Sequence, residues 1–81
     1  MTSPYWPPER VIIAPANEAE RAAVRTAQRA LRVDVTGDMD DATRSALRGV
    51  QRLFKLPVSG VLDKPTAQAL DRLRPPSLRG D

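Results

Sequence analysis

Apolar residues recur at helical spacing in three stretches of the chain, over residues 18–32, 41–55 and 64–74. Successive residues of a helix are rotated by about 100°, so residues three, four and seven apart share one face. The expected core combines these faces with three loop residues: Ala23, Val24, Ala27, Ala30, Leu31, Ala46, Leu47, Val50, Leu53, Phe54, Leu70 and Leu73, with Val35, Val58 and Leu62 from the loops. The pattern predicts an all-α fold, a small three-helix bundle, with a few extended residues where the valine-bearing loops cross.

Polar residues at the start of each stretch are typical of helix N-termini. Asn17 is followed three residues later by Glu20, which is the spacing of a capping box, and Asp40 and Asp63 precede the second and third helices. Each connection also contains a glycine, at positions 37 and 60, where a positive φ has no steric cost. We therefore expect the helices to begin directly after the three polar caps.

The chain contains a repeat of 23 residues. Pairing residues 19–51 with 42–74 gives 12 identities in 33 positions, against about three expected from the composition. The identities fall at positions with structural meaning, such as Gln28 with Gln51. We interpret the pattern as a tandem duplication in which the turns are repeated along with the helices.

Prolines set the limits of the helical region. Four of the eight lie within residues 1–16 and two form a pair at 75–76, and proline fixes φ and lacks an N–H. We therefore expect an extended anchoring arm over 1–16, a bundle over 17–74 and a short C-terminal tail over 75–81. The arm is too apolar for a solvated segment. Its candidate partner-binding residues are Tyr5, Trp6, Val11, Ile12 and Ile13. Two alternatives stay open: the arm packs on its own bundle, or it binds another protein chain.

The two loops and the helices around them resemble a known family. Segments 35–43 and 58–66, each preceded by a helix with a Gln-Arg pair, are similar to the peptidoglycan-binding domains, which are small three-helix modules. The resemblance covers about residues 24–73. It implies a non-catalytic module of the kind that is commonly attached to cell-wall hydrolases. The chain departs from the family pattern at Thr36 and Ser59, because the family usually has aspartate before the loop glycine.

Polar loop residues are the candidate ligand-binding groups. Four of them can form hydrogen bonds with sugar hydroxyls or peptide amides. They are Thr36, Asp38, Asp41 and Ser59. Alternatively, they serve only the turns and the helix caps, because such turns require Asp, Asn, Ser or Thr. The two repeated glutamines lie at the border of the apolar faces, where we expect each amide to tie a loop backbone to the bundle.

Basic residues form a stripe opposite the apolar face on each of the first two helices. The stripes consist of Arg21, Arg25, Arg29 and Arg32 on the first helix and Arg44, Arg48, Arg52 and Lys55 on the second. They can bind nucleic acid, a teichoic-type polymer or an acidic protein surface, or they are a solvated face without a ligand. Nucleic acid is an unfavoured partner, because no aromatic residue lies among the basic ones and the intervening loop is acidic.

Length and composition exclude several classes of function. With 81 residues and a net charge of +3, the chain has room for one thin core and not for a deep substrate chamber. It has no cysteine and no histidine, which removes thiolate and imidazole nucleophiles and the usual soft-metal ligands. The clustered aspartates before the second helix are better explained as caps than as an acid–base pair. We expect no cofactor, no metal and no catalytic activity.

The expected location follows from the family resemblance and from the ends of the sequence. No export signal and no membrane-spanning stretch is recognisable. Since a cell-wall ligand lies outside the cytoplasm, we favour a small decoration or structural protein on the surface of a larger assembly, such as a phage virion that adheres to peptidoglycan. Without such an assembly the expected location is the cytoplasm. The alternatives are an accessory protein of a cell-wall enzyme, a purely structural interaction protein and a small DNA-associated protein.

Overall fold

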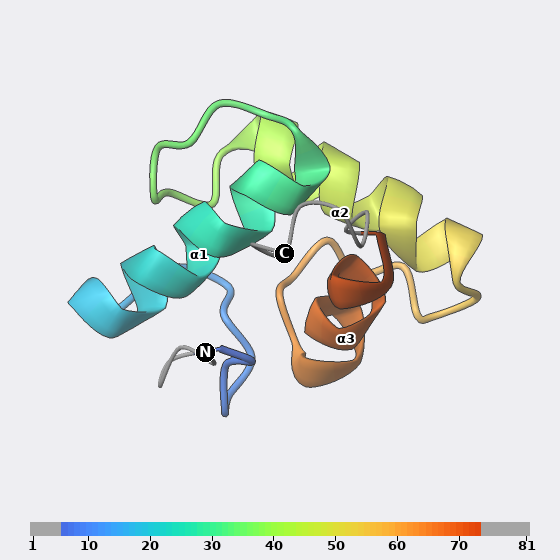
Figure 1. The fold of residues 1–81 in the computed structure, drawn as a ribbon, viewed down its shortest axis with the longest axis horizontal. Helices are drawn as coiled ribbons and strands as arrows, with labels where there is room; N and C mark the ends of the chain where they lie inside the picture. Colours follow the sequence, from blue (N-terminus) through green and yellow to red (C-terminus); the bar gives the residue numbers. More distant parts are fainter. Residues whose placement is uncertain (1–5, 74–81) are drawn as a thin grey trace, which may run out of the picture.

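The computed structural model describes residues 6–73, which form three α-helices joined by two loops (Figure 1). Helix α1 spans Glu18–Leu31, α2 spans Asp41–Leu53 and α3 spans Lys64–Leu73. The predicted all-α three-helix bundle is confirmed, and each helix ends within two residues of the predicted position. Within the described part of the chain, no helix has both the length and the apolar composition that a membrane crossing requires.

Side-chain caps start all three helices at the predicted residues. Asn17, Asp40 and Asp63 each accept a hydrogen bond from the backbone N–H three residues further on, at 2.9, 3.0 and 3.1 Å. The predicted capping box at α1 is only half formed. The Glu20 carboxylate accepts from the N–H of Ala16 at 2.8 Å instead of from the N–H of the cap residue. The helix N-terminus is therefore tied to the residue before the cap.

A residue in the left-handed backbone conformation caps the end of α1, and another, 23 residues later, follows the end of α2. Arg32 has φ 60° and Lys55 has φ 57°. After each of them, the next backbone N–H returns to a carbonyl in the last turn, that of Gln28 at 3.2 Å and that of Gln51 at 2.8 Å. This bonding satisfies carbonyls that a helix end leaves unpaired. It also explains why both helices stop slightly earlier than the apolar pattern predicts.

The core lies between the three helices and includes residues from outside them. Its buried apolar members are Trp6, Ile12, Ala23, Val24, Ala27, Met39, Leu47, Val50, Leu62, Ala67, Ala69 and Leu70. Ala30, Leu31, Phe54 and Leu56 are partly buried against this cluster. The apolar faces of the helices were therefore largely predicted, whereas Trp6, Ile12 and Met39 are additions that the helical pattern does not contain.

Four residues expected in the core are exposed, and for these the prediction was wrong. Val35 and Val58 are 44% and 46% exposed, because the loop backbone after each valine turns inward to a buried glutamine and leaves the valine on the outer side. Leu53 is 68% exposed at the end of α2, since Phe54 and Leu56 make the core contacts beyond it. Leu73, the last residue of α3, is 39% exposed.

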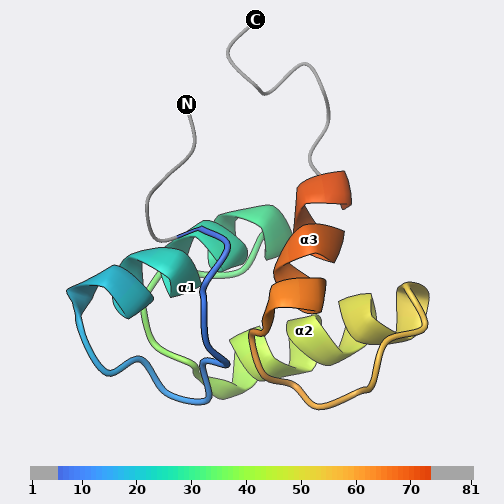
Figure 2. The same ribbon diagram turned by 90° about the horizontal axis from the view of Figure 1, so that it is seen from below.

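The described part of the arm runs between α1 and α3, as both views show (Figure 2). Trp6 is 7% exposed, and its indole N–H donates to the Asp71 carboxylate of α3 at 3.0 Å. Ile12 is 1% exposed and forms an antiparallel bridge with Leu62, with N···O distances of 2.9 and 3.1 Å. For these two residues, the alternative of packing on their own bundle is the one observed.

The single bridge also corrects the predicted extended pairing. That pairing was expected where the valine-bearing loops cross, but it joins the arm to the loop before α3. An arm residue rather than a loop valine fills the position beside Leu62 and completes the core. Tyr5, the rest of residues 1–5 and the tail from 74 to 81 lie outside the described residues.

Candidate ligand-binding surfaces

A fully buried glutamine, Gln28, organises the first loop. Its side-chain carbonyl accepts from the backbone N–H groups of Thr36 and Gly37, both at 2.9 Å. Its amide nitrogen donates to the Thr36 hydroxyl at 3.0 Å, to the Asp38 carbonyl at 2.9 Å and to the Thr43 hydroxyl at 2.9 Å. One side chain of α1 therefore fixes both the loop backbone and the first turn of α2.

Gln51 organises the second loop with the same set of bonds. Its carbonyl accepts from the N–H groups of Ser59 and Gly60, at 3.0 and 2.9 Å. Its amide nitrogen donates to the Ser59 hydroxyl at 3.2 Å and to the Val61 carbonyl and Thr66 hydroxyl at 3.1 Å. Every partner lies 23 residues after its counterpart in the first loop. The predicted role of the two glutamines is confirmed, while an origin by tandem duplication stays a prediction.

The glycine at each turn lies beneath an arginine. Gly37 has φ +83° and Gly60 has φ +75°, a region that other residues rarely adopt. A methyl group on Gly37 would lie 3.0 Å from a terminal nitrogen of Arg25, and one on Gly60 would lie 2.9 Å from the same nitrogen of Arg48. Two residues of the predicted basic stripes therefore lie against the turn glycines, and it is the positive φ that requires glycine, because the end of an arginine side chain can move aside.

The two hydroxyls proposed as ligand groups are used inside the turns. The Thr36 hydroxyl accepts from the glutamine amide and donates to the Asp40 carboxylate at 3.2 Å. The Ser59 hydroxyl accepts from the second glutamine and lies 3.4 Å from the N–H of Val61. These contacts match the turn-and-cap alternative for Thr36 and Ser59, and ligand binding by either hydroxyl stays a prediction.

The two carboxylates proposed as ligand groups lie at the surface of the first loop. Asp38 is 3.4 Å from a guanidinium nitrogen of Arg21, with both side chains about half exposed or more. Asp41 is fully exposed and lies 3.9 Å from Arg44. Surface pairs of this kind contribute little to stability. Both carboxylates are therefore accessible to a ligand.

Asp40 stands apart from these surface acids as a structural carboxylate. The hydroxyl of Thr43 and then its backbone N–H both donate to it, and together with the Thr36 hydroxyl they hold the pKa of Asp40 below its ordinary value of 3.8. Hydrogen bonds to the charged form favour that form. The cap of α2 is therefore an ionised carboxylate over the whole neutral range.

Acidic neighbours pair with part of each basic stripe. Arg21, Arg25 and Arg44, which lie toward the helix N-termini, pair with Asp38, Glu18 and Asp41. No ion pair with another residue of 6–73 is found for the four at the C-terminal ends of the stripes, which are Arg29, Arg32, Arg52 and Lys55. Arg48 likewise has no ion pair among these residues, so two of the four residues are paired in the first stripe and one of four in the second. Binding of a polyanion by the unpaired residues stays a prediction.

The arm residues proposed for partner binding separate by exposure. Trp6 and Ile12 are buried in the core, which leaves them little surface for another chain. Val11 and Ile13, on either side of Ile12, are 52% and 69% exposed. Partner binding therefore stays a prediction for Val11 and Ile13.

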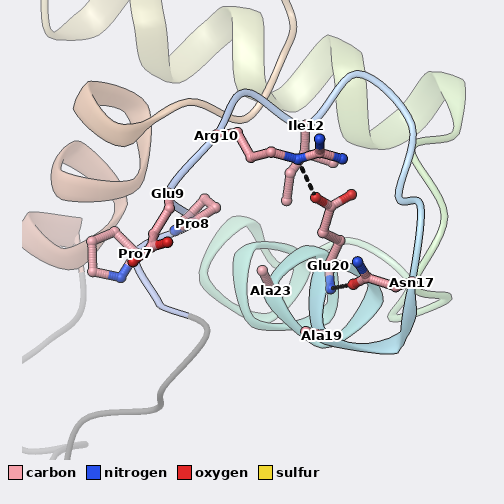
Figure 3. A pocket seen from close by; sticks show the side chains of 9 residues that line it. All are labelled: Pro7, Pro8, Glu9, Arg10, Ile12, Asn17, Ala19, Glu20 and Ala23. Carbon is pink, nitrogen blue, oxygen red and sulfur yellow. Dashed lines mark hydrogen bonds and ion pairs between the residues drawn. The ribbon is translucent and has the colours of Figure 1, made fainter.

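A groove of about 380 Å³ lies between the arm and the first turns of α1 (Figure 3). Its lining comprises Pro7, Pro8, Glu9, Arg10, Ile12, Asn17, Ala19, Glu20 and Ala23. The prolines and Glu9 belong to the arm side, and the two alanines and Glu20 belong to the helix. The volume is within the range of about 300–1,000 Å³ that is usual for small-ligand sites.

One ion pair joins the two sides of the groove. The Arg10 guanidinium donates through Nε to the Glu20 carboxylate at 2.9 Å. The N–H of Ala16, followed by Arg10, holds the pKa of Glu20 below its ordinary value of 4.5. Glu20 is therefore ionised at neutral pH, and it orients Arg10 at the groove.

Sequence reasoning did not identify this groove. Glu20 was assigned to a capping box and the arm to anchoring, and neither assignment brings Arg10 beside α1. The available signal was the apolar character of the arm, which predicted burial without saying against which surface. The groove follows from the positions of Trp6 and Ile12, which are tertiary contacts far apart in sequence from their partners.

Comparison with known families identifies the bundle. Residues 22–70, more than half of the chain, match the family described as Putative peptidoglycan binding domain. The matched region contains both loops, both buried glutamines and most of the three helices. No curated protein and no solved structure is significantly similar to the chain. The chain therefore belongs to the family of peptidoglycan-binding domains, as the resemblance of its two loops implied.

Proposed function

We propose that the chain acts as a non-catalytic module that binds the peptidoglycan of bacterial cell walls. The observation that carries this proposal is the family match over residues 22–70, which includes the whole glutamine-organised scaffold. The scaffold supports it physically, because each loop is fixed by five hydrogen bonds from one side chain. A loop that is ordered before binding loses less conformational entropy when a ligand is bound.

Peptidoglycan offers sugar hydroxyls, amides, carboxylates and ammonium groups, and the described surface offers partners for all of them. The exposed carboxylates Asp38 and Asp41 can accept from hydroxyls, amides and ammonium groups, and the adjacent Arg21 and Arg44 can donate to carboxylates. We assign these loop residues to the proposed ligand-binding surface, together with the groove beside α1.

A pull-down on purified sacculi tests the proposal. The full 81-residue chain should sediment with sacculi at physiological salt and stay in solution without them. The doubly substituted variant Asp38→Asn and Asp41→Asn tests the loop contribution, with Lys64→Gln at the start of α3 as the matched control. Failure of the unsubstituted chain to sediment at physiological salt would overturn the proposed function.

A role within a larger assembly is a second proposal, and it rests on one observation. Val11 and Ile13 expose apolar side chains on the arm, and exposed apolar side chains can mark a protein contact. Neither the fold nor the family match points to a virion. Val11→Ser together with Ile13→Ser should abolish co-purification of the chain with the proteins of such an assembly and leave sacculus binding unchanged. Unchanged co-purification would exclude this role for the arm.

A further inference from the structure

We propose that the groove between the arm and α1 binds the peptide part of peptidoglycan, as a short peptide with a free carboxylate and a free ammonium group. This inference rests on the proposed function and assigns its ligand chemistry. Eight of the nine lining residues precede residue 22 and only Ala23 falls inside the matched domain. The groove therefore lies almost entirely outside the matched residues, between the arm and the first turns of α1.

The floor and walls of the groove suit methyl groups better than sugar rings. Ile12 and Ala23 are almost fully buried beneath the groove, at 1% exposed each, so the apolar surface that a ligand can reach comes mainly from Pro7 and Ala19. A sugar hydroxyl that faced this apolar part of the groove, away from its four polar residues, would lose its bound water without gaining a partner, which is unfavourable. The alanine side chains of a wall peptide carry no such group. The apolar lining thus favours peptide over glycan.

Arg10 supplies the recognition of a carboxylate. Its Nε is occupied by Glu20, but its two terminal nitrogens have no partner among residues 6–73, and the side chain is 72% exposed. Figure 3 shows the Glu20 side chain extending from α1 toward the Arg10 guanidinium of the arm. Glu20 is in turn held by the N–H of Ala16 at 2.8 Å. The guanidinium is therefore positioned in advance, and it can bind a carboxylate with charge-assisted hydrogen bonds.

Glu9 supplies the complementary charge on the arm side. It is exposed, lines the same groove and has no ion pair with another residue of 6–73. A carboxylate at this position can accept hydrogen bonds from an ammonium group. A guanidinium held by Glu20 and a second acid, Glu9, around an apolar floor fit a zwitterionic peptide, such as a wall peptide whose diamino acid is not cross-linked.

Titration of the full chain with soluble ligands tests this inference. Trp6 is the only tryptophan and is buried next to Pro7 of the groove, so its fluorescence reports occupancy. A soluble wall peptide (stem peptide) whose diamino acid is not cross-linked should change the Trp6 fluorescence saturably. An N-acetylglucosamine oligomer without peptide should not. Arg10→Gln should weaken peptide binding roughly tenfold or more. The matched control, Arg29→Gln on α1, should bind as the unsubstituted chain does.

Urea unfolding separates a lost contact from a lost fold. Since Arg10 is largely exposed, Arg10→Gln should unfold at nearly the same urea concentration as the unsubstituted chain. Unchanged peptide affinity in that variant, or saturable binding of the glycan oligomer instead of the peptide, would overturn the inference. If sacculi retain the chain but no stem peptide binds, the inference fails and the proposed function stands. Loss of sacculus retention as well would overturn both.

Discussion

Replacing Gln28 by leucine removes the side chain that holds the first loop while keeping a similar volume. Leucine cannot accept from the N–H groups of Thr36 and Gly37, nor donate to the Asp38 carbonyl and the Thr43 hydroxyl. The substitution therefore tests whether one amide fixes the loop or merely accompanies a loop that is fixed by its other contacts.

The expected loss follows from which partners water can reach. Gly37 is buried, so its N–H stays unpaired, at a cost of about 1–3 kcal/mol. Thr43 is also buried, but its hydroxyl keeps the Asp40 carboxylate as a partner. The groups of Thr36 and Asp38 are partly buried and can bond to water, so each costs only about 0.5–1.5 kcal/mol. Together these costs should lower the free energy of unfolding by about 2–6 kcal/mol.

Urea unfolding followed by circular dichroism measures this loss. Gln51→Leu should give a similar loss, because its partners match those of Gln28 one for one. The control Gln68→Leu, at an exposed position of α3, should change stability by less than about 0.5 kcal/mol. Because a small domain has little stability in reserve, sucrose should be added equally to all samples to keep a folded baseline. A Gln28→Leu loss no larger than that of the control would refute the reasoning.

Three further predictions concern turns, helix ends and pH. Gly37→Ala should lower the free energy of unfolding by about 1 kcal/mol, because φ is +83° and alanine is strained there. Gly49→Ala, with open space within α2, should instead raise it by about 0.5–1 kcal/mol. Equal effects of the two substitutions in urea unfolding would contradict this. Arg32→Gly should raise thermal stability, because φ 60° at this cap favours glycine; a lower melting temperature would exclude strain there. The lowered pKa values of Glu20 and Asp40 contribute stability that is fully present above their ordinary values of 4.5 and 3.8 and is lost as pH falls through the lowered values. Glu20→Gln should therefore flatten the pH dependence of the free energy of unfolding in that range. An unchanged slope would exclude a contribution from Glu20.

Local sequence signals predicted the helices and their starts because each signal acts over a few residues. Asn17, Asp40 and Asp63 cap helices by bonding the N–H three positions later, so the sequence contains both partners. The same holds for the turn glycines, whose φ depends on the local chain. The apolar periodicity also identified most of the helical core, because the faces of a helix follow from its geometry.

The features that sequence reasoning missed depend on contacts between residues that are far apart in the chain. Val35 and Val58 were expected inside because they are apolar, yet the inward bonds of the following residues leave them outside. Trp6 and Ile12 are buried by α3 and by the loop before it, partners at least 50 residues away in the chain. Apolar character predicted that these arm residues are buried, but it does not specify the surface, and the groove depends on that surface.

The two halves of the bundle share their structural residues and differ in their exposed ones. The buried glutamine, the turn glycine and the capping aspartate occur in both. In contrast, the accessible acids Asp38 and Asp41 of the first half correspond to Val61 and Lys64 in the second. The groove likewise involves α1 and the arm, without α2 or α3. The residues that both halves share therefore hold the loops and the helix starts in place. Recognition is expected to depend on residues that the second half lacks, on the loop before α2 and beside the N-terminus of α1.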